Sequence, residues 1–122
     1  MRKLPLALGA AAFLVLACDP TQKKDFHCTA DFQEIEACTQ FHITEAEGLA
    51  ADPICTDHKG GQWRTGACPT DEEGAARVAG YCLVEASDYT LSGTDAKVYF
   101  YDPVTAEAAA AACDSHGTWV AP

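Results

Sequence analysis

The stretch Cys55-Thr56-Asp57-His58-Lys59-Gly60-Gly61-Gln62-Trp63 contains a pattern that returns near the end of the chain as Cys113-Asp114-Ser115-His116-Gly117-Thr118-Trp119. In both copies a cysteine is followed by two small polar residues, a histidine, glycine and then a tryptophan. Glycine in the left-handed conformation commonly ends a helix, and tryptophan favours strands. The pattern therefore predicts, twice, a helix that ends at glycine and a strand that begins at tryptophan.

The chain between the two copies is rich in β-branched and aromatic residues, which is typical of antiparallel strands. The elements that we expect there are strands over residues 62–67, 78–85 and 96–101, a turn at 71–74 that joins the first two, a glycine-containing loop at 91–94, and an alanine-rich helix over 105–116.

The sequence pattern in the N-terminal half of the chain, over residues 31–51, predicts helices. Phe32, Ile35 and Cys38 recur at helical spacing, so we expect a helix over 31–42. Residues 44–47, Thr-Glu-Ala-Glu, have the spacing of a capping box and predict a short helix to residue 51, followed by a further turn that Asp-Pro can start. The expected fold class is α+β: a small disulfide-stabilised antiparallel sheet with N-terminal helices and one late alanine-rich helix.

The first seventeen residues have the three parts of a secretory signal peptide. Arg2 and Lys3 give the positive start, residues 4–16 form an apolar run, and Ala17 is the small residue before Cys18. The run is shorter than the roughly 20 apolar residues of a membrane-spanning helix. The alternative is an ordinary signal peptide whose cysteine enters a disulfide, but six further cysteines form an even set that needs no seventh.

The residues Val15-Leu16-Ala17-Cys18 resemble the lipobox of bacterial lipoproteins, with valine where leucine is usual. The resemblance implies cleavage before Cys18, lipid on that cysteine, and anchoring to a membrane of the bacterial cell envelope. Asp19 is similar to the residue that keeps some Gram-negative lipoproteins at the inner membrane; the outer membrane is the alternative. The expected organisation is a signal peptide over 1–17, a lipidated tether over 18–25 and a disulfide-rich domain over 26–122. The Cys…Gly-Gly-x-Trp segments also resemble those of small bacterial lipoproteins of unassigned function.

Six cysteines remain in the expected domain: Cys28, Cys38, Cys55, Cys68, Cys82 and Cys113. In an exported protein this number predicts three disulfides, with fifteen possible connectivities. Cys68–Cys82 is the favoured single pair, because the two cysteines would face each other across the turn at 71–74, and Cys55–Cys68 is the alternative. Cys28–Cys38 is not expected, because the predicted helix would hold the two Cα atoms too far apart.

The net charge of the chain limits the classes of molecule that it is expected to bind. Removal of the signal peptide would leave 18 acidic and six basic residues, a net charge of −12. Such a surface repels nucleic acid and attracts basic proteins, so we expect no nucleic-acid partner and consider a basic envelope or secreted protein. The alternative is a solvated acidic coat that only keeps the domain soluble.

Cysteine thiols could bind a metal or act as nucleophiles only if they are not oxidised to disulfides. Cys55-x-x-His58, Cys113-x-x-His116 and Cys38-x-x-x-His42 have the spacing of zinc ligands. Disulfide formation would remove the thiolates, so we expect no metal and no cofactor. The chain has no Gly-x-Ser-x-Gly elbow, and the acidic residues at 71–73 predict a solvated turn. The sequence therefore predicts that the protein is not an enzyme.

The aromatic residues are the remaining candidates for recognising a partner. Alternation along the strand over 96–101 predicts Val98 and Phe100 on one side and Tyr99 and Tyr101 on the other. We expect Tyr99 and Tyr101 to form the binding face. The predicted function is a lipid-anchored envelope lipoprotein with a structural or protein-binding role. The alternative is a small inhibitor of a basic secreted enzyme such as a lysozyme or protease.

Overall fold

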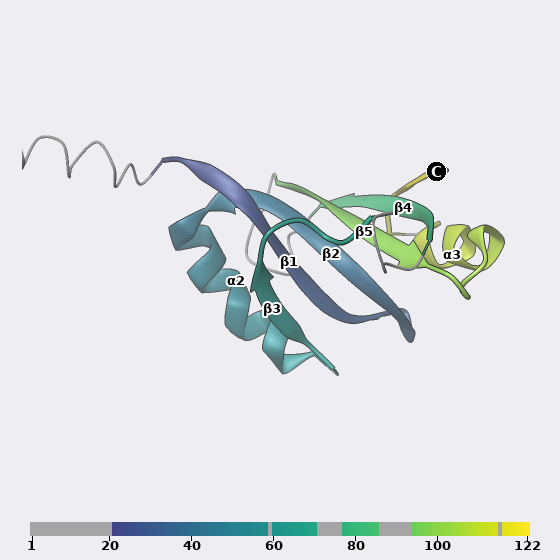
Figure 1. Ribbon diagram of the computed structural model, residues 1–122, viewed down its shortest axis with the longest axis horizontal. Helices are drawn as coiled ribbons and strands as arrows, with labels where there is room; N and C mark the ends of the chain where they lie inside the picture. The colour runs from purple at the N-terminus through teal and green to yellow at the C-terminus, as the bar shows by residue number, and fades with distance from the viewer. Residues whose placement is uncertain (1–20, 59, 71–76, 86–93, 115) are drawn as a thin grey trace, which may run out of the picture.

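The computed structural model describes residues 21–58, 60–70, 77–85, 94–114 and 116–122. Within these residues, six strands form one antiparallel sheet in the order β3-β1-β2-β5-β4-β6, with two helices beside it (Figure 1). The elements in chain order are β1 (Lys23–Phe32), β2 (Ile35–Thr44), α2 (Glu45–Asp57), β3 (Gln62–Thr65), β4 (Val78–Glu85), β5 (Asp95–Tyr101), α3 (Ala106–Cys113) and β6 (Thr118–Val120). The expected disulfide-rich α+β class is confirmed.

The described elements form two units with the same order of strand, strand, helix and strand. The first unit is β1-β2-α2-β3 and the second is β4-β5-α3-β6; they join along β2 and β5, so the strand order of one mirrors that of the other. One row of Cα partners crosses the whole sheet as Trp63, Cys28, Thr39, Val98, Cys82 and Trp119. The repeated cysteine-to-tryptophan pattern is therefore part of a structural repeat with approximate two-fold symmetry between β2 and β5.

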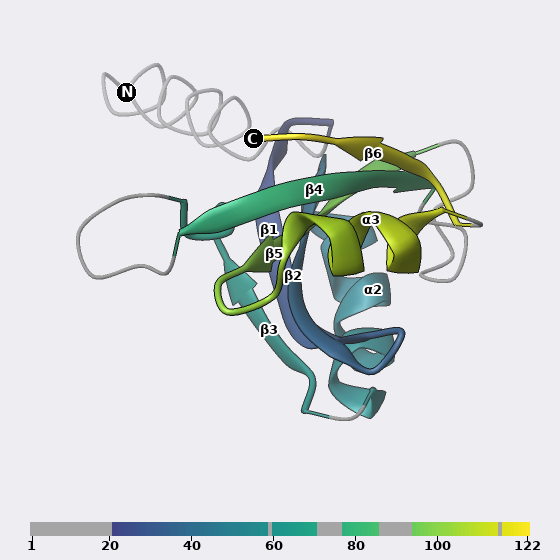
Figure 2. The same ribbon diagram turned by 90° about the vertical axis from the view of Figure 1, so that its right-hand side faces the viewer.

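Both helices lie on the same face of the sheet. Side chains of direct partners in an antiparallel sheet point to the same side, so the row that joins Cys28 to Cys82 directs both toward one face. Cys28 is bonded to Cys55 of α2 and Cys82 to Cys113 of α3, with Cα–Cα distances of 5.9 and 5.6 Å. In Figure 2, α3 lies in front of the sheet beside β4. Each disulfide thus fastens a helix to the strand beneath it.

The core on this face consists of two clusters, and each takes an alanine from the other unit. Phe41 of β2 and Phe100 of β5 are fully buried at equivalent positions, one in each cluster. Ala37 of β2 packs in the cluster of Phe100, whereas Ala96 of β5 packs in the cluster of Phe41. Each unit therefore needs the other to complete its core.

The two tryptophans pack differently. Trp63 stacks on Phe26 with ring centroids 5.4 Å apart. In the second unit the position equivalent to Phe26 is Gly80, which lies opposite Phe100 on β5 as Phe26 lies opposite Phe41 on β2. A Cβ atom on Gly80 would overlap the six-membered ring of Trp119, and the residue has a φ of 140°. Glycine at this position makes room for the Trp119 ring.

The helix predicted over 31–42 is wrong, because these residues form the end of β1, a tight turn and most of β2. Gln33 and Glu34 make the turn, with φ values of 51° and 65°. Phe32 and Cys38 have helical spacing in the sequence, but they lie on different strands of a hairpin. Cys28 and Cys38 are not bonded to each other, as expected, although strands and not a helix hold them. The first strand also begins at Lys23, within the segment expected to be tether.

The capping box is confirmed. The Thr44 side chain accepts a hydrogen bond from the Glu47 backbone N–H at 3.2 Å, and Glu47 Oε1 accepts one from the Thr44 N–H at 2.9 Å. The expected helix end at Ala51 is wrong: α2 continues to Asp57 with Pro53 inside it. Ala51 and Cys55 are fully buried against the sheet, and this packing outweighs the hydrogen bond that proline removes.

The C-terminal half follows the sequence closely. β4 coincides with the strand predicted over 78–85, β5 starts one residue before 96, and β6 contains Trp119. α3 begins after the Thr105 cap but ends at Cys113, before the predicted end at residue 116. Gly60 has the expected left-handed φ of 72°, whereas Gly117 in the second copy does not lie in that region.

The pairing of Cys68 with Cys82 or Cys55 is wrong. β3 pairs with β1 at one edge of the sheet, while β4 lies in the other unit between β5 and β6, so β3 and β4 are not neighbours. Cys68 is bonded to Cys38 of β2, with a Cα–Cα distance of 6.0 Å. The expected turn at 71–74 and the expected loop at 91–94, except for Thr94, lie outside the described residues. The prediction that all six cysteines are oxidised is confirmed.

Replacing Gly80 with alanine should lower the free energy of unfolding by about 2–4 kcal/mol, because overpacking against Trp119 adds to backbone strain at positive φ. Gly66→Ala is the matched control: Gly66 also has a positive φ, of 111°, but no atom lies within 4 Å of the place that its Cβ would occupy. We expect that control to lose only about 1 kcal/mol in chemical denaturation. Equal losses in the two variants would contradict a steric role for Trp119.

Candidate functional site

The face of the sheet away from the helices, here called the open face, carries a group of aromatic side chains on β4 and β5. Tyr81 and Tyr99 are direct partners, with ring centroids 5.3 Å apart. Lys97 Nζ lies 5.2 Å from the centroid of the Tyr81 ring. All three residues are partly buried, so part of each side chain is accessible to a partner. Tyr81 belongs with the predicted Tyr99, although the sequence pattern did not single it out.

The predicted alternation along β5 is confirmed. Val98 and Phe100 are buried on the helix side, with 1% and 0% of their surface exposed. Tyr99 and Tyr101 are partly buried on the open face. That these two tyrosines bind a partner stays a prediction.

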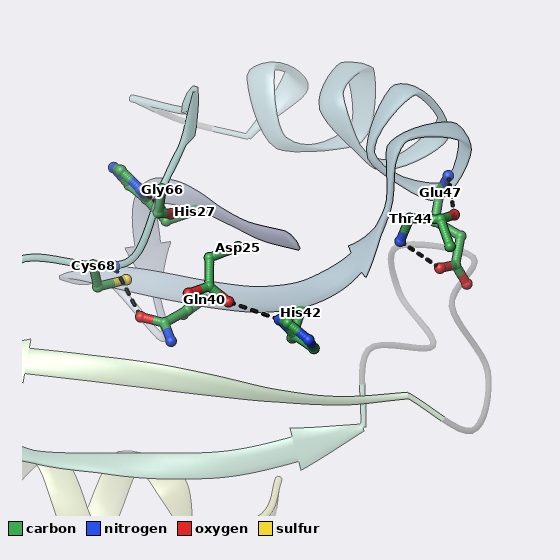
Figure 3. A network of polar contacts seen from close by, with 8 residues as sticks. All are labelled: Asp25, His27, Gln40, His42, Thr44, Glu47, Gly66 and Cys68. Carbon is green, nitrogen blue, oxygen red and sulfur yellow. Dashed lines mark hydrogen bonds and ion pairs between the residues drawn. The ribbon is translucent and has the colours of Figure 1, made fainter. Parts of the chain in front are cut away.

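A segment after β3 crosses the open face and is fixed at several points. The Cys38–Cys68 disulfide ties it to β2, and the Cys68 N–H donates to Gln40 Oε1 at 2.8 Å (Figure 3). The Tyr101 hydroxyl donates to the Pro69 carbonyl oxygen at 2.6 Å. The crossing segment, residues 66–70, therefore covers part of β2 and makes Tyr101 a structural contact.

The N-terminal half of the open face is polar. His27 Nδ1 lies 2.9 Å from the Gly66 carbonyl oxygen (Figure 3). A carbonyl oxygen only accepts, so this hydrogen bond requires that Nδ1 carries a hydrogen. His42 Nδ1 lies 3.0 Å from Asp25 Oδ1 across the β1-β2 pair, and both side chains are exposed. At the far end of β2, the hydrogen bond from the Thr44 N–H lowers the pKa of Glu47. These contacts join β1 to β2, join β1 to the residue after β3, and cap α2.

A groove of about 280 Å³ opens beside Tyr101 at one end of the open face. Its first wall comes from the hairpin strands, with Thr29, Glu36, Ala37 and Cys38. The other wall comes from the crossing segment and the end of β5, with Pro69, Tyr101, Asp102, Pro103 and Val104. The groove thus combines apolar walls with two carboxylates.

The candidate zinc ligands do not come together. Cys38, Cys55 and Cys113 are all in disulfides. His116 instead packs edge-on against Phe32, with ring centroids 5.6 Å apart. Within the residues that the structure describes, no group of three histidine, cysteine or acidic side chains is placed to hold a metal ion.

None of the helices in the described part of the chain is both long and apolar enough to cross a membrane.

Comparison with known proteins finds no relative. No protein-family model matches the chain, and no curated protein or solved structure matches it.

The groove and the crossing segment could not be found in the sequence. Glu36 and Asp102 are 66 positions apart, and what brings them together is the pairing of β2 with β5 across the two units. The one available signal was the even number of cysteines, which required a partner for Cys68 but did not identify Cys38.

Tyr101 should titrate at a higher pH than an ordinary tyrosine. Burial, and then the nearby Tyr99, raise its pKa to about 12 from an ordinary value near 10. Because the folded pKa is raised, the stability from the neutral phenol is fully present below pH 10 and is lost as the pH rises through about 12. Tyr101→Phe should remove this step from an ultraviolet titration and cost about 1 kcal/mol of stability. Tyr99→Phe is the control; loss of the same step in that variant would contradict the assignment.

Proposed function

We propose that this protein is a lipid-anchored lipoprotein of the bacterial cell envelope that binds another protein through the open face of its sheet. Two features support the envelope location. Val15-Leu16-Ala17-Cys18 resembles a lipobox, and three disulfides in a small domain are typical of proteins exported to an oxidising compartment. Residues 1–20, which contain the lipobox-like segment, lie outside the described part of the chain.

The observation that carries the binding role is the aromatic and aliphatic surface over the second unit. Tyr81 and Leu83 of β4, Tyr99 of β5 and Val120 of β6 share the open face by strand register. All four side chains are partly exposed to solvent. The uncovered face of an antiparallel sheet usually carries polar residues, so four aromatic or aliphatic side chains there are unusual. Partly exposed tyrosines with apolar neighbours are typical of protein interfaces.

The start of β1 determines how far the domain can lie from its anchor. Four residues, 19–22, separate Cys18 from Lys23, the first residue of the strand. Five Cα–Cα steps span at most about 18 Å. A lipid on Cys18 would therefore hold the domain close to its membrane, and the partner is expected near that membrane surface.

The second candidate function is inhibition of a basic secreted enzyme. The observation that favours it is the pair of exposed carboxylates, Glu36 and Asp102, at the groove of an acidic chain. Complementary charge speeds encounter with a basic protein and weakens it as salt rises. We prefer a general protein-binding role over inhibition of a basic enzyme, because binding through the tyrosine surface does not require the partner to be basic.

The anchor is tested by the mature N-terminus. Mass spectrometry of protein extracted from membranes should find Cys18 as the first residue, carrying lipid, because the signal peptide would be removed just before it. Cys18→Ala should abolish lipid attachment and release of the signal peptide together, whereas Cys68→Ala should affect neither. A mature N-terminus elsewhere, or an unmodified Cys18, would refute the anchor.

The binding face is tested by replacing Tyr81 and Tyr99 with serine. We expect at least about a tenfold loss of partner capture, the effect of removing about 1.4 kcal/mol of contact energy. Capture is measured by crosslinking in intact cells, with the same variants checked for disulfides and cooperative unfolding. Leu49→Ser is the matched control, since Leu49 is 71% exposed on α2, away from the open face. Unchanged capture in the tyrosine variant, or an equal loss in the control, would contradict this face.

A further inference from the structure

We infer that the groove beside Tyr101 is a pocket for an arginine side chain of the partner protein. The inference rests on the proposed binding role and specifies the partner's chemistry.

The groove exists because β2 and β5 separate at this end of the sheet. Their ladder runs from Gln40–Lys97 to Cys38–Tyr99, and continued register would place Glu36 opposite Tyr101. Instead, the Asp102 N–H donates to the Arg77 carbonyl oxygen at 2.9 Å, which continues β5 along the β4 side. The two strands diverge, and the space between them is open at the surface.

The walls of the groove suit an aliphatic stem. Ala37 is buried, and Pro69, Pro103 and Val104 add apolar surface with no side-chain hydrogen-bonding group. The Tyr101 ring is held in place by its hydrogen bond to Pro69. The volume of about 280 Å³ lies near the lower end of the roughly 300–1,000 Å³ of small-molecule pockets and leaves room for a single long side chain.

The charge at the groove favours a cation. Glu36 and Asp102 are exposed, and neither forms an ion pair with any residue that the structure describes. The lining contains no basic residue, and the chain that follows Cys18 carries 18 acids against six bases. Arginine combines an apolar stem with a planar head that can bond carboxylates and stack on an aromatic ring. It therefore matches both the walls and the mouth.

The probe is a short capped peptide, acetyl-Gly-Arg-Gly-amide, titrated into isotope-labelled mature protein extracted in detergent. We expect saturable shifts of the backbone amide signals of Glu36, Ala37, Asp102 and Val104, with weak affinity appropriate to one side chain. A peptide with neutral citrulline in place of arginine should bind about tenfold more weakly, because it keeps the shape but loses the charge-assisted hydrogen bonds.

Variants locate the effect in the groove. Glu36→Gln together with Asp102→Asn should also weaken the arginine peptide about tenfold. Asp57→Asn with Glu85→Gln is the matched control, since it removes the same charge from exposed positions outside the groove and should leave affinity within about twofold. Equal effects of the two pairs would show general charge attraction and overturn the pocket.

Two other results would overturn the inference: equal binding of the citrulline peptide, or no saturable shift at the groove. In either case, loss of partner capture in the Tyr81 and Tyr99 variant would still support the proposed function. Conversely, the arginine peptide can bind while that capture experiment fails, so the two tests separate the pocket from the wider binding role.

Discussion

Each helix is held to the sheet by a disulfide in the central row of strand partners, and the rest of the structure depends on this attachment. α3 has eight residues, a length at which an isolated helix is unstable in water. The side chains that it buries are those of Ala109 and Cys113, which contribute little apolar area. A disulfide that closes a loop with a sequence separation of 31 contributes about 3–4 kcal/mol by restricting the unfolded chain. Covalent linkage thus compensates for a helix face made of small residues.

The candidate site lies where the two-fold symmetry is broken. Cys38 of β2 is bonded to the crossing segment, and the equivalent position on β5 is Lys97, which instead approaches Tyr81. The crossing segment consequently covers part of β2 on the open face, while β4 and β5 retain their tyrosines. The groove forms at the boundary between them, where Pro69 meets the end of β5. The same disulfide therefore both holds the crossing segment over part of β2 and places Pro69 in the wall of the groove.

Local features of the sequence were predictive where local chemistry determines structure. The Thr44 capping box, the β4 strand and the alternation of Val98 with Tyr99 were all identified, because each depends on near neighbours. The prediction of a helix over 31–42 was wrong because the turn of the hairpin is made by Gln33 and Glu34. Neither residue is glycine, so nothing in the sequence signalled a turn. The partner of Cys68 failed because it depends on strand order across the sheet. Of the candidate site, only Tyr99 and Tyr101 could be predicted from the sequence; Tyr81 required the register of β4 with β5, and the groove required knowing that β2 and β5 are neighbours.

The exchange of Ala37 and Ala96 between the two clusters has a consequence for how the chain acquires its structure. A repeat whose core is complete in itself can fold as soon as it has been synthesised. Here the core of the first unit also needs Ala96, which lies 59 positions after Ala37, the equivalent residue of the first unit. Until β5 pairs, the β2 edge stays open and the apolar surface around Phe41 is incompletely covered. Such an intermediate is exposed to edge-to-edge association with other chains. Contacts between strands so distant in sequence also slow the search for the native state. The protein is built from two similar halves, yet neither half completes its core until β5 pairs with β2.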